Sequence, residues 1–450
     1  MKSLIKLGRI ALTAGLVCAL LTGCTLLPSA ISTTSLKVME SQSDTITLTR
    51  DEYDRLSKYA ALDEITSMVE YYYYMEPDMD AMLEGAKRGL LAGLDDPYTY
   101  YYNPEEYASL WENDSGEYGG VGIQISASYV TMLCTITRVF SDSPADKAGL
   151  RKGDVLVKVD DLDVSATTLY DAVRIMRGEL GTPVAITVLR GTEFLDFSVP
   201  RELVHVNWVS STLLDGNVGY IQLYDFSGDC YQRFAEQLDA LIKQHAKALI
   251  IDLRDNPGGW VDDAVNIADL FISSETVTYL EYRNGQRDYY DATPGALSIP
   301  LVVLINENSA SASEILAGAF QDYGMATIVG TQSYGKGIVQ FVLPLSGEDE
   351  GAGMQISAAK YYTPSGRSVH KAGITPDIIA ELPEDDQTLY ELGDLADTQL
   401  NAAYEVALSL IDRSFVTALP GTTEEPSQDA ETEADSAATG VDPEYLIVVS

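Results

Sequence analysis

The sequence predicts an α/β multidomain protein with an N-terminal helical region, an inserted β-rich domain that carries two helices, and an α/β core. Three observations lead to this fold class. Apolar residues recur at helical spacing from Thr49 to Trp111, short β-rich runs split by turn residues begin at Gly116, and strands alternate with helices from Asn217. The chain has 450 residues, enough for roughly two to four domains, and 46% of them are hydrophobic, so a sizeable core can form.

Residues 1–23 are expected to be an export signal. Lys2, Lys6 and Arg9 precede an apolar stretch, residues 10–21, that is too short for a comfortable membrane span. The stretch ends in LTGC, which resembles the bacterial lipobox, so Cys24 would be lipidated and become the new N-terminus. An ordinary cleaved signal with a coincidental cysteine is the alternative. We therefore expect a lipoprotein held outside the cytoplasmic membrane, with residues 24–48 as a tether.

Residues 49–115 are predicted to be helical. In AMLEGAKRGLLAGL, apolar residues recur every four positions, as on one face of a helix, at Met82, Ala86, Leu90 and Leu94. The four tyrosines at 71–74 are expected to pack in a helix, although such a cluster could instead form a binding surface.

Residues 116–203 are predicted to form the β-rich domain. Runs such as GGVGIQISA, DVLVKVDD and VAITVLRG are typical of strands, and SPADKAGL and ATTLYDAVRIMRG are typical of helices. The length suits a single domain.

Residues 204–412 are predicted to form the α/β core. ALIIDLR is continuously apolar before Asp252, which is typical of a strand covered on both faces, and LVVLIN and ATIVGT have the same character. Residues 413–450 are predicted to be a disordered acidic tail, because GTTEEPSQDAETEADSAATG lacks aromatic residues.

Charge and cysteine content exclude some functions. A formal net charge of -39 argues against a nucleic-acid partner, because phosphates would be repelled. Cys134 and Cys230 are expected to be buried free thiols, with a disulfide as the less favoured alternative. No CxxC pair or Cys/His cluster occurs, so no metal site is predicted.

Candidate catalytic residues begin with three serines on alternate positions, Ser309, Ser311 and Ser313. A serine needs a base to remove its proton. Nothing singles out a histidine for this role among His205, His245 and His370. Lys336, between two glycines and near apolar residues, could serve if burial lowers its pKa, although a solvated turn lysine is the default for one lysine taken alone.

The stretch DLRDNPGGWVDDAV, residues 252–265, places a glycine pair between a strand and a helix. Exposed N–H groups at such a helix start can stabilise an oxyanion. A tight strand-to-helix turn would use the same residues, so the motif alone leaves both interpretations open.

Taken together, DLRDNPGG, SASASEI and YGKGIVQ resemble the carboxy-terminal processing peptidases, or tail-specific proteases, which are serine proteases with a Ser/Lys dyad. LDDPYTYYYNPEEY and GITPD extend the resemblance over about residues 50–410. The resemblance implies a protease core of this type, without metal or other cofactor. It implies Ser311 as nucleophile, Lys336 as base and Gln340 as its support. The oxyanion donors would be the N–H groups of Ala312 and of one glycine of the pair, with Gly258 preferred over Gly259.

The β-rich domain resembles a PDZ domain. YGGVGIQI fits the loop that binds a peptide's C-terminal carboxylate, and SPADKAGLRKGDVLVKVDD is common in bacterial PDZ domains. A simple hairpin turn is the alternative for GGVG. The resemblance implies peptide contacts at Gly120, Val121, Gly122, Ile123, Ile125 and Val173. Arg177 could relay peptide binding to the core, although an exposed helix-end arginine is the simpler interpretation.

The expected function is therefore an exported, lipid-anchored serine endopeptidase that recognises proteins or peptides with free, apolar C-termini. Two alternatives remain open: a PDZ adaptor whose protease core has decayed, and a tricorn-type protease that acts on short peptides. Intact Ser311, Lys336 and Gln340 argue against the adaptor. Similar proteins dimerise through N-terminal helices, so a homodimer is a further expectation.

Overall fold

The computed structural model describes residues 47–128, 131–383 and 390–417. The signal peptide, Cys24, nearly all of the tether and most of the acidic tail lie outside these ranges, and the expectations for them stay predictions. The chain divides into two compact units, residues 1–78 with 346–350, and residues 79–345 with 351–450. Within the described ranges, no helix combines the length and the apolar character needed to cross a bilayer.

The first unit contains the helices α2 (Arg50–Leu56), η1 (Ser57–Tyr59), α3 (Ala60–Tyr72) and η3 (Gly347–Asp349). Helix α2 begins with a capping box, in which Thr49 N donates to the Glu52 carboxylate at 2.7 Å. No residue of α2, η1 or α3 is buried. The tyrosines at 71–74 are 47–82% exposed, so the prediction that they pack in a helix is wrong. The cause is that the described helices α2, η1 and α3 form no buried core for them to enter.

The second unit begins with α4 (Met79–Ala92), β1 (Tyr100–Tyr102) and α5 (Pro104–Ser115). Strand β1 belongs to an antiparallel sheet of order β1-β18-β13-β14, in which β17 also pairs with β18. Its other strands come from the core sequence: β13 (Thr276–Tyr282), β14 (Arg287–Asp291), β17 (Ile338–Pro344) and β18 (Gly353–Tyr362). This sheet therefore joins residues near position 100 to residues near position 355.

The β-rich domain contains two helices, as predicted. Its main sheet has the order β3-β4-β5-β7-β8, with β6 on β5, and a separate ribbon pairs β2 with β9. Its elements are β2 (Glu117–Gly120), β3 (Ile123–Ala127), β4 (Cys134–Val139), α6 (Pro144–Ala148), β5 (Val155–Val159), β6 (Leu162–Asp163), α7 (Leu169–Met176), β7 (Pro183–Arg190), β8 (Glu193–Pro200) and β9 (Glu202–His205). The domain has its own hydrophobic core, which includes Cys134.

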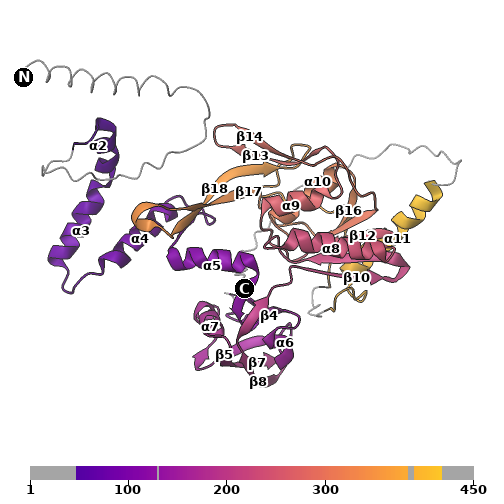
Figure 1. Cartoon of the computed structure of the whole chain (residues 1–450), viewed down its shortest axis with the longest axis horizontal. Helices are drawn as coiled ribbons and strands as arrows, with labels where there is room; N and C mark the ends of the chain where they lie inside the picture. Colours follow the sequence, from indigo (N-terminus) through magenta and orange to yellow (C-terminus); the bar gives the residue numbers. More distant parts are fainter. Residues whose placement is uncertain (1–46, 129–130, 384–389, 418–450) are drawn as a thin grey trace, which may run out of the picture. The chain divides into compact units, whose positions relative to one another are not determined.

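The α/β core is a six-stranded sheet with helices on both faces (Figure 1). The strand order is β10-β11-β12-β15-β16-β19, and all pairs except β10–β11 are parallel. The strands are β10 (Val209–Leu214), β11 (Val218–Leu223), β12 (Ala248–Asp252), β15 (Leu301–Ile305), β16 (Ala326–Gly330) and β19 (Ile378–Ile379), and η2 (Asp215–Asn217) connects the first two.

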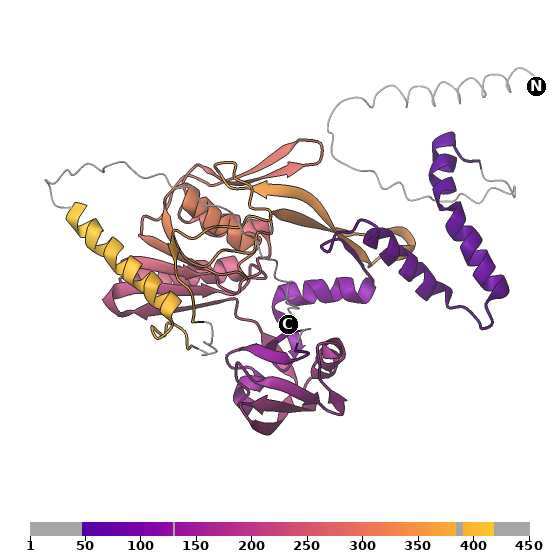
Figure 2. The same ribbon diagram turned by 180° about the vertical axis from the view of Figure 1, so that it is seen from behind.

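Side chains of β12 alternate between two hydrophobic clusters. Leu249 and Ile251 pack with α8 (Cys230–Lys243), α9 (Val261–Asp269) and α10 (Ala312–Asp322), whereas Ala248 and Ile250 pack with α11 (Thr398–Thr417). Figure 2 shows α11, in yellow, along the face of the sheet opposite to the other helices. Both faces are thus covered, which explains the continuously apolar strand and confirms the predicted α/β character. Cys134 and Cys230 are buried and free, as predicted.

Candidate active site

Ser311 lies at the start of α10 in a backbone conformation that is rare for residues other than glycine. Its φ is 54° and its ψ is −113°, and such strain is characteristic of functional turns. Ser309 Oγ donates to Leu253 O at 2.7 Å, and Ser313 Oγ donates to Asn256 O at 2.9 Å. The outer serines therefore attach this turn to the loop after β12, and Ser311 is left between them at the apex.

The buried carboxylate of Glu314, in the first turn of α10, organises the site. Glu314 is 1% exposed and accepts hydrogen bonds from Ser311 N at 2.9 Å, Gly335 N at 2.7 Å and Lys336 N at 2.9 Å. It also accepts from Ser333 Oγ at 2.6 Å and from the Tyr361 hydroxyl at 3.2 Å. Burial raises the pKa of Glu314, and these hydrogen bonds oppose that shift. The carboxylate thus connects the serine turn to the lysine loop. The capping-box spacing Ser311–Glu314 was the signal that could have revealed it.

Lys336 lies in the loop between β16 and β17, and its flanking glycines are required by close packing. A Cβ on Gly337 would lie 2.3 Å from His370 N, and one on Gly335, where φ is 89°, would lie 3.1 Å from Gly373 N. Burial lowers the pKa of the Lys336 ammonium, and the negative charge of Glu314 opposes this effect. The solvated turn lysine considered above is therefore not what the fold contains.

The glycine pair packs directly against the serine turn. A Cβ on Gly258 would lie 2.7 Å from the Cβ of Ser311 and 2.9 Å from Ala312 N. Gly258 N, however, donates to Asn256 Oδ1 at 2.9 Å, so this N–H already has an acceptor. Gly259 lines the cleft instead, and its N–H forms no hydrogen bond within the described residues. The preference for Gly258 over Gly259 as oxyanion donor is thus not supported.

A cleft of about 350 Å³ brings together the predicted residues Ser311, Lys336 and Gln340. Gln340 Nε2 donates to Ile338 O at 3.2 Å, at the start of β17. The cleft is also lined by Leu110, Asp114, Trp208, Asp225, Ser227, Gly259, Trp260, Val261, Val339, Val342 and Gln355. None of the three histidines is among the residues that line it. Burial raises the pKa of the Asp225 carboxyl to about 7.

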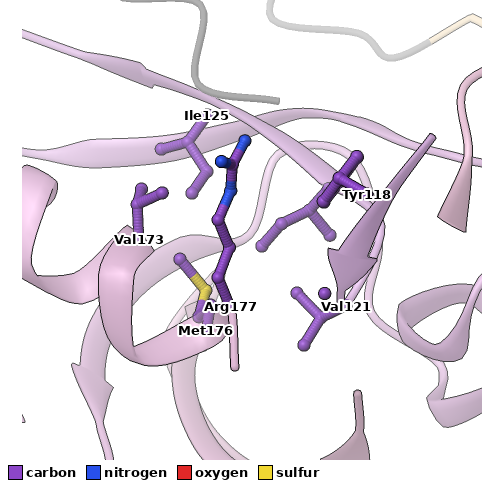
Figure 3. Close-up of a pocket in the computed structure, with 8 residues that line it drawn as sticks. Tyr118, Val121, Ile125, Val173, Met176 and Arg177 are labelled. Carbon is purple, nitrogen blue, oxygen red and sulfur yellow. The ribbon is translucent and has the colours of Figure 1, made fainter. Parts of the chain in front are cut away.

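A second, much smaller pocket of about 20 Å³ lies in the β-rich domain, between β3 and α7 (Figure 3). Five of the six residues predicted to contact a peptide line it, namely Gly120, Val121, Ile123, Ile125 and Val173. Tyr118, Met176 and Arg177 complete the lining, and Figure 3 shows the Arg177 side chain extended between Ile125 and Tyr118. The Arg177 guanidinium lies 5.2 Å from the Tyr118 ring centroid.

Gly122 has a different place from the one predicted. It is not part of the pocket lining, and a Cβ at this position would lie 2.3 Å from the Cβ of Ser143. Its φ of 87° also favours glycine. Gly122 is therefore needed for the turn before β3, and a bulky substitution there would disturb the domain and not only the pocket.

Comparison with known proteins gives consistent matches. Residues 217–380 match peptidase family S41, and residues 135–190 match the PDZ domain. The carboxyl-terminal-processing protease of Synechocystis sp. is 39% identical over 324 residues, which cover 70% of this chain and 75% of that protein. The carboxy-terminal processing protease of Bacillus subtilis is 33% identical over 378 residues, which cover 80% of each chain. Among solved structures, a photosystem II D1 C-terminal processing protease aligns with a TM-score of 0.51 and 31% identity, over 75% of this chain and 96% of that one.

Proposed function

The chain belongs to the carboxyl-terminal processing proteases of peptidase family S41, serine peptidases with a PDZ domain, and from this premise we propose that it cleaves proteins by acyl transfer with a Ser311/Lys336 dyad. The observation that carries the proposal is the shared cleft. It joins a strained serine at a helix start to a half-buried lysine whose pKa is lowered by burial.

In the proposed mechanism, the neutral amine of Lys336 takes the proton of Ser311 while Oγ attacks the scissile carbonyl. The oxyanion that forms accepts hydrogen bonds from Ala312 N–H, at the start of α10, and from Gly259 N–H. The lysine then donates its proton to the leaving amine, and water hydrolyses the acyl-enzyme. Glu314 holds both backbone segments in position, and Gln340 supports the lysine.

Substrate choice is proposed to depend on the free C-terminus of the substrate. The pocket between β3 and α7 has apolar walls at Val121, Ile125 and Val173, which suits an apolar last residue. Backbone N–H groups of residues 120–123 would then receive the carboxylate, and the peptide would pair with β3.

We expect a substrate with an amidated C-terminus to be cleaved about 10–100-fold less efficiently than the same substrate with a free carboxylate, because charge-assisted hydrogen bonds are lost. Val173→Glu should abolish this preference by placing a charge in the apolar pocket. Tyr170→Glu, on the exposed side of α7, is the matched control and should keep it. The measurement is kcat/KM on both substrates. Equal kcat/KM of the parent on the free and amidated substrates would contradict tail recognition. If the parent cleaves neither substrate, the proposed protease activity is contradicted.

Anchoring through Cys24 is a separate part of the proposal, and so is a location outside the cytoplasmic membrane. Cys24→Ala should release the protein from the membrane fraction or leave an unprocessed precursor, because no lipid can be attached. Cys18→Ala, within the signal, is the control and should behave as the parent. Immunoblots of membrane and soluble fractions provide the measurement. A Cys24→Ala protein that is processed and fractionates like the parent would refute the anchor.

Dimerisation through the N-terminal helices is also proposed. Large apolar side chains of α2 and α3 are about half exposed, namely Leu56, Leu62, Ile65 and Met68. Burial of these side chains against a second copy would be favourable.

A further inference from the structure

The Lys336 ammonium lies against an aromatic ring and not against the serine. Its Nζ is 4.9 Å from the centroid of the Tyr98 ring, within the range of a cation–π interaction. Among the hydrogen bonds and ion pairs of the described residues, none involves Lys336 Nζ, and so none joins it to Ser311 Oγ.

Tyr98 is held in place by the sheet into which the lysine loop leads. The residue lies just before β1, which pairs with β18. Gln355 Nε2 on β18 donates to Tyr98 O at 3.1 Å, and Ser357 N donates to Thr99 Oγ1 at 3.0 Å. Strand β18 also pairs with β17, which begins two residues after Lys336. The contact between ring and ammonium is therefore part of the architecture of this sheet.

We propose that Tyr98 is a positioning residue for the general base: its ring binds the protonated side chain of Lys336 in the enzyme before substrate arrives, and so sets the pH range of activity. The inference rests on the proposed role of Lys336 as base. A ring face attracts an ammonium but not a neutral amine, so the contact favours the inactive, protonated form. When the proton passes to solvent, the amine is free to turn toward Ser311.

Other ionisable groups surround the lysine, and their influence must be separated from that of the ring. They are Glu314 on α10, Tyr334 in the same loop, Lys360 and Tyr361 on β18, His370 and Lys371 in the loop against Gly335 and Gly337, and Asp114 and Asp225 in the lining of the cleft. Among these groups, Glu314 is the one whose charge raises the pKa of Lys336 and so opposes the effect of burial. Variants of Tyr98 leave all of these groups in place.

The test is the pH dependence of kcat/KM in variants of Tyr98. Activity should rise with pH as Lys336 loses its proton, because only the neutral amine accepts a proton from serine. Tyr98→Leu removes the ring and keeps the site apolar, so the acid limb should move to lower pH by about 0.5–1 unit. Tyr98→Phe keeps the ring and should leave the limb within about 0.2 unit of the parent. Tyr98→Trp, which offers the most strongly attracting ring, should move the limb to higher pH.

A purely structural role for Tyr98 has a different signature. Activity would then fall by the same factor at every pH in Tyr98→Leu and Tyr98→Trp, with the limb unmoved, and the inference would be overturned. Thermal melts followed by circular dichroism check that each variant folds. If Tyr98→Leu does not fold, Tyr98→Trp alone tests the inference. A general loss of packing would lower activity at every pH, whereas the inference expects the acid limb to move to higher pH.

A direct titration separates this inference from the proposed mechanism. The side-chain resonance of Lys336 can be followed by NMR in labelled Ser311→Ala protein and identified by its loss in Lys336→Gln. If Tyr98→Leu lowers this pKa while the kcat/KM limb does not follow, Lys336 is not the base, so the proposed mechanism fails and only the effect of the ring on the lysine ammonium remains. If Tyr98→Leu leaves the pKa of Lys336 unchanged, the inference itself is wrong.

Discussion

Ser311→Ala and Lys336→Ala should each reduce kcat by about 10⁴-fold or more, and the double variant should be little worse than either single one. The physical reason is that the serine and its base act as a unit, so removal of either leaves the other without a function. Lys336→Arg should fail as well, because a guanidinium stays protonated and cannot accept the serine proton. The measurement is single-turnover cleavage of a substrate with a free C-terminus, together with labelling by a serine-reactive probe.

The neighbouring serines are the matched controls. Ser309→Ala and Ser313→Ala remove hydroxyls that donate to Leu253 O and Asn256 O, so some stability should be lost while substantial activity remains. Among the three serine variants, only Ser311→Ala should abolish labelling by the probe, and labelling of the parent distinguishes an active protease from a decayed adaptor. A Lys336→Ala protein with near-parental turnover, or a Ser309→Ala protein that is inactive while Ser311→Ala works, would contradict the dyad.

Glu314→Ala should lower the free energy of unfolding by roughly 3–5 kcal/mol, because several buried donors lose their acceptor at once. These donors include the backbone N–H groups of Ser311, Gly335 and Lys336. Turnover should fall by about 100-fold or more, because a displacement of about 1 Å between the serine and lysine segments is enough for such a loss. Denaturant unfolding and kcat of the folded protein are the two measurements.

Glu314→Gln gives the sharper comparison. It keeps the size of the side chain but replaces one acceptor oxygen by an NH₂ group, which meets donors such as Gly335 N or Lys336 N. We expect its loss of stability and activity to lie between the parent and Glu314→Ala. Glu307→Gln, an exposed carboxylate on the preceding turn, is the control and should change neither quantity much. Parental turnover in Glu314→Ala would show that this carboxylate does not hold the site.

Local patterns were sufficient to predict the fold class, because each rests on interactions between residues close in sequence or on burial of a whole element. The parallel strand 248–252 is apolar up to its last residue, Asp252, because both its faces are covered. Turn chemistry made Ser311 and Lys336 candidates, and the resemblance to the tail-specific proteases gave them their roles and added Gln340; the structure places all three around one cleft.

Only the tertiary structure could reveal the residues that act across long sequence separations. Tyr98 lies over a lysine 238 positions later because β1 pairs with β18, a pairing that no local pattern in the tyrosine-rich segment indicates. Glu314 resembles an ordinary helix-capping residue until the loop of Lys336 folds against it. The sequence alone does not show whether Gly258 or Gly259 can donate to an oxyanion. The structure distinguishes them, because Gly258 N already donates to Asn256 Oδ1. For Tyr98 and Glu314, the deciding contact joins segments that only the folded sheet and helices bring within hydrogen-bonding or van der Waals distance.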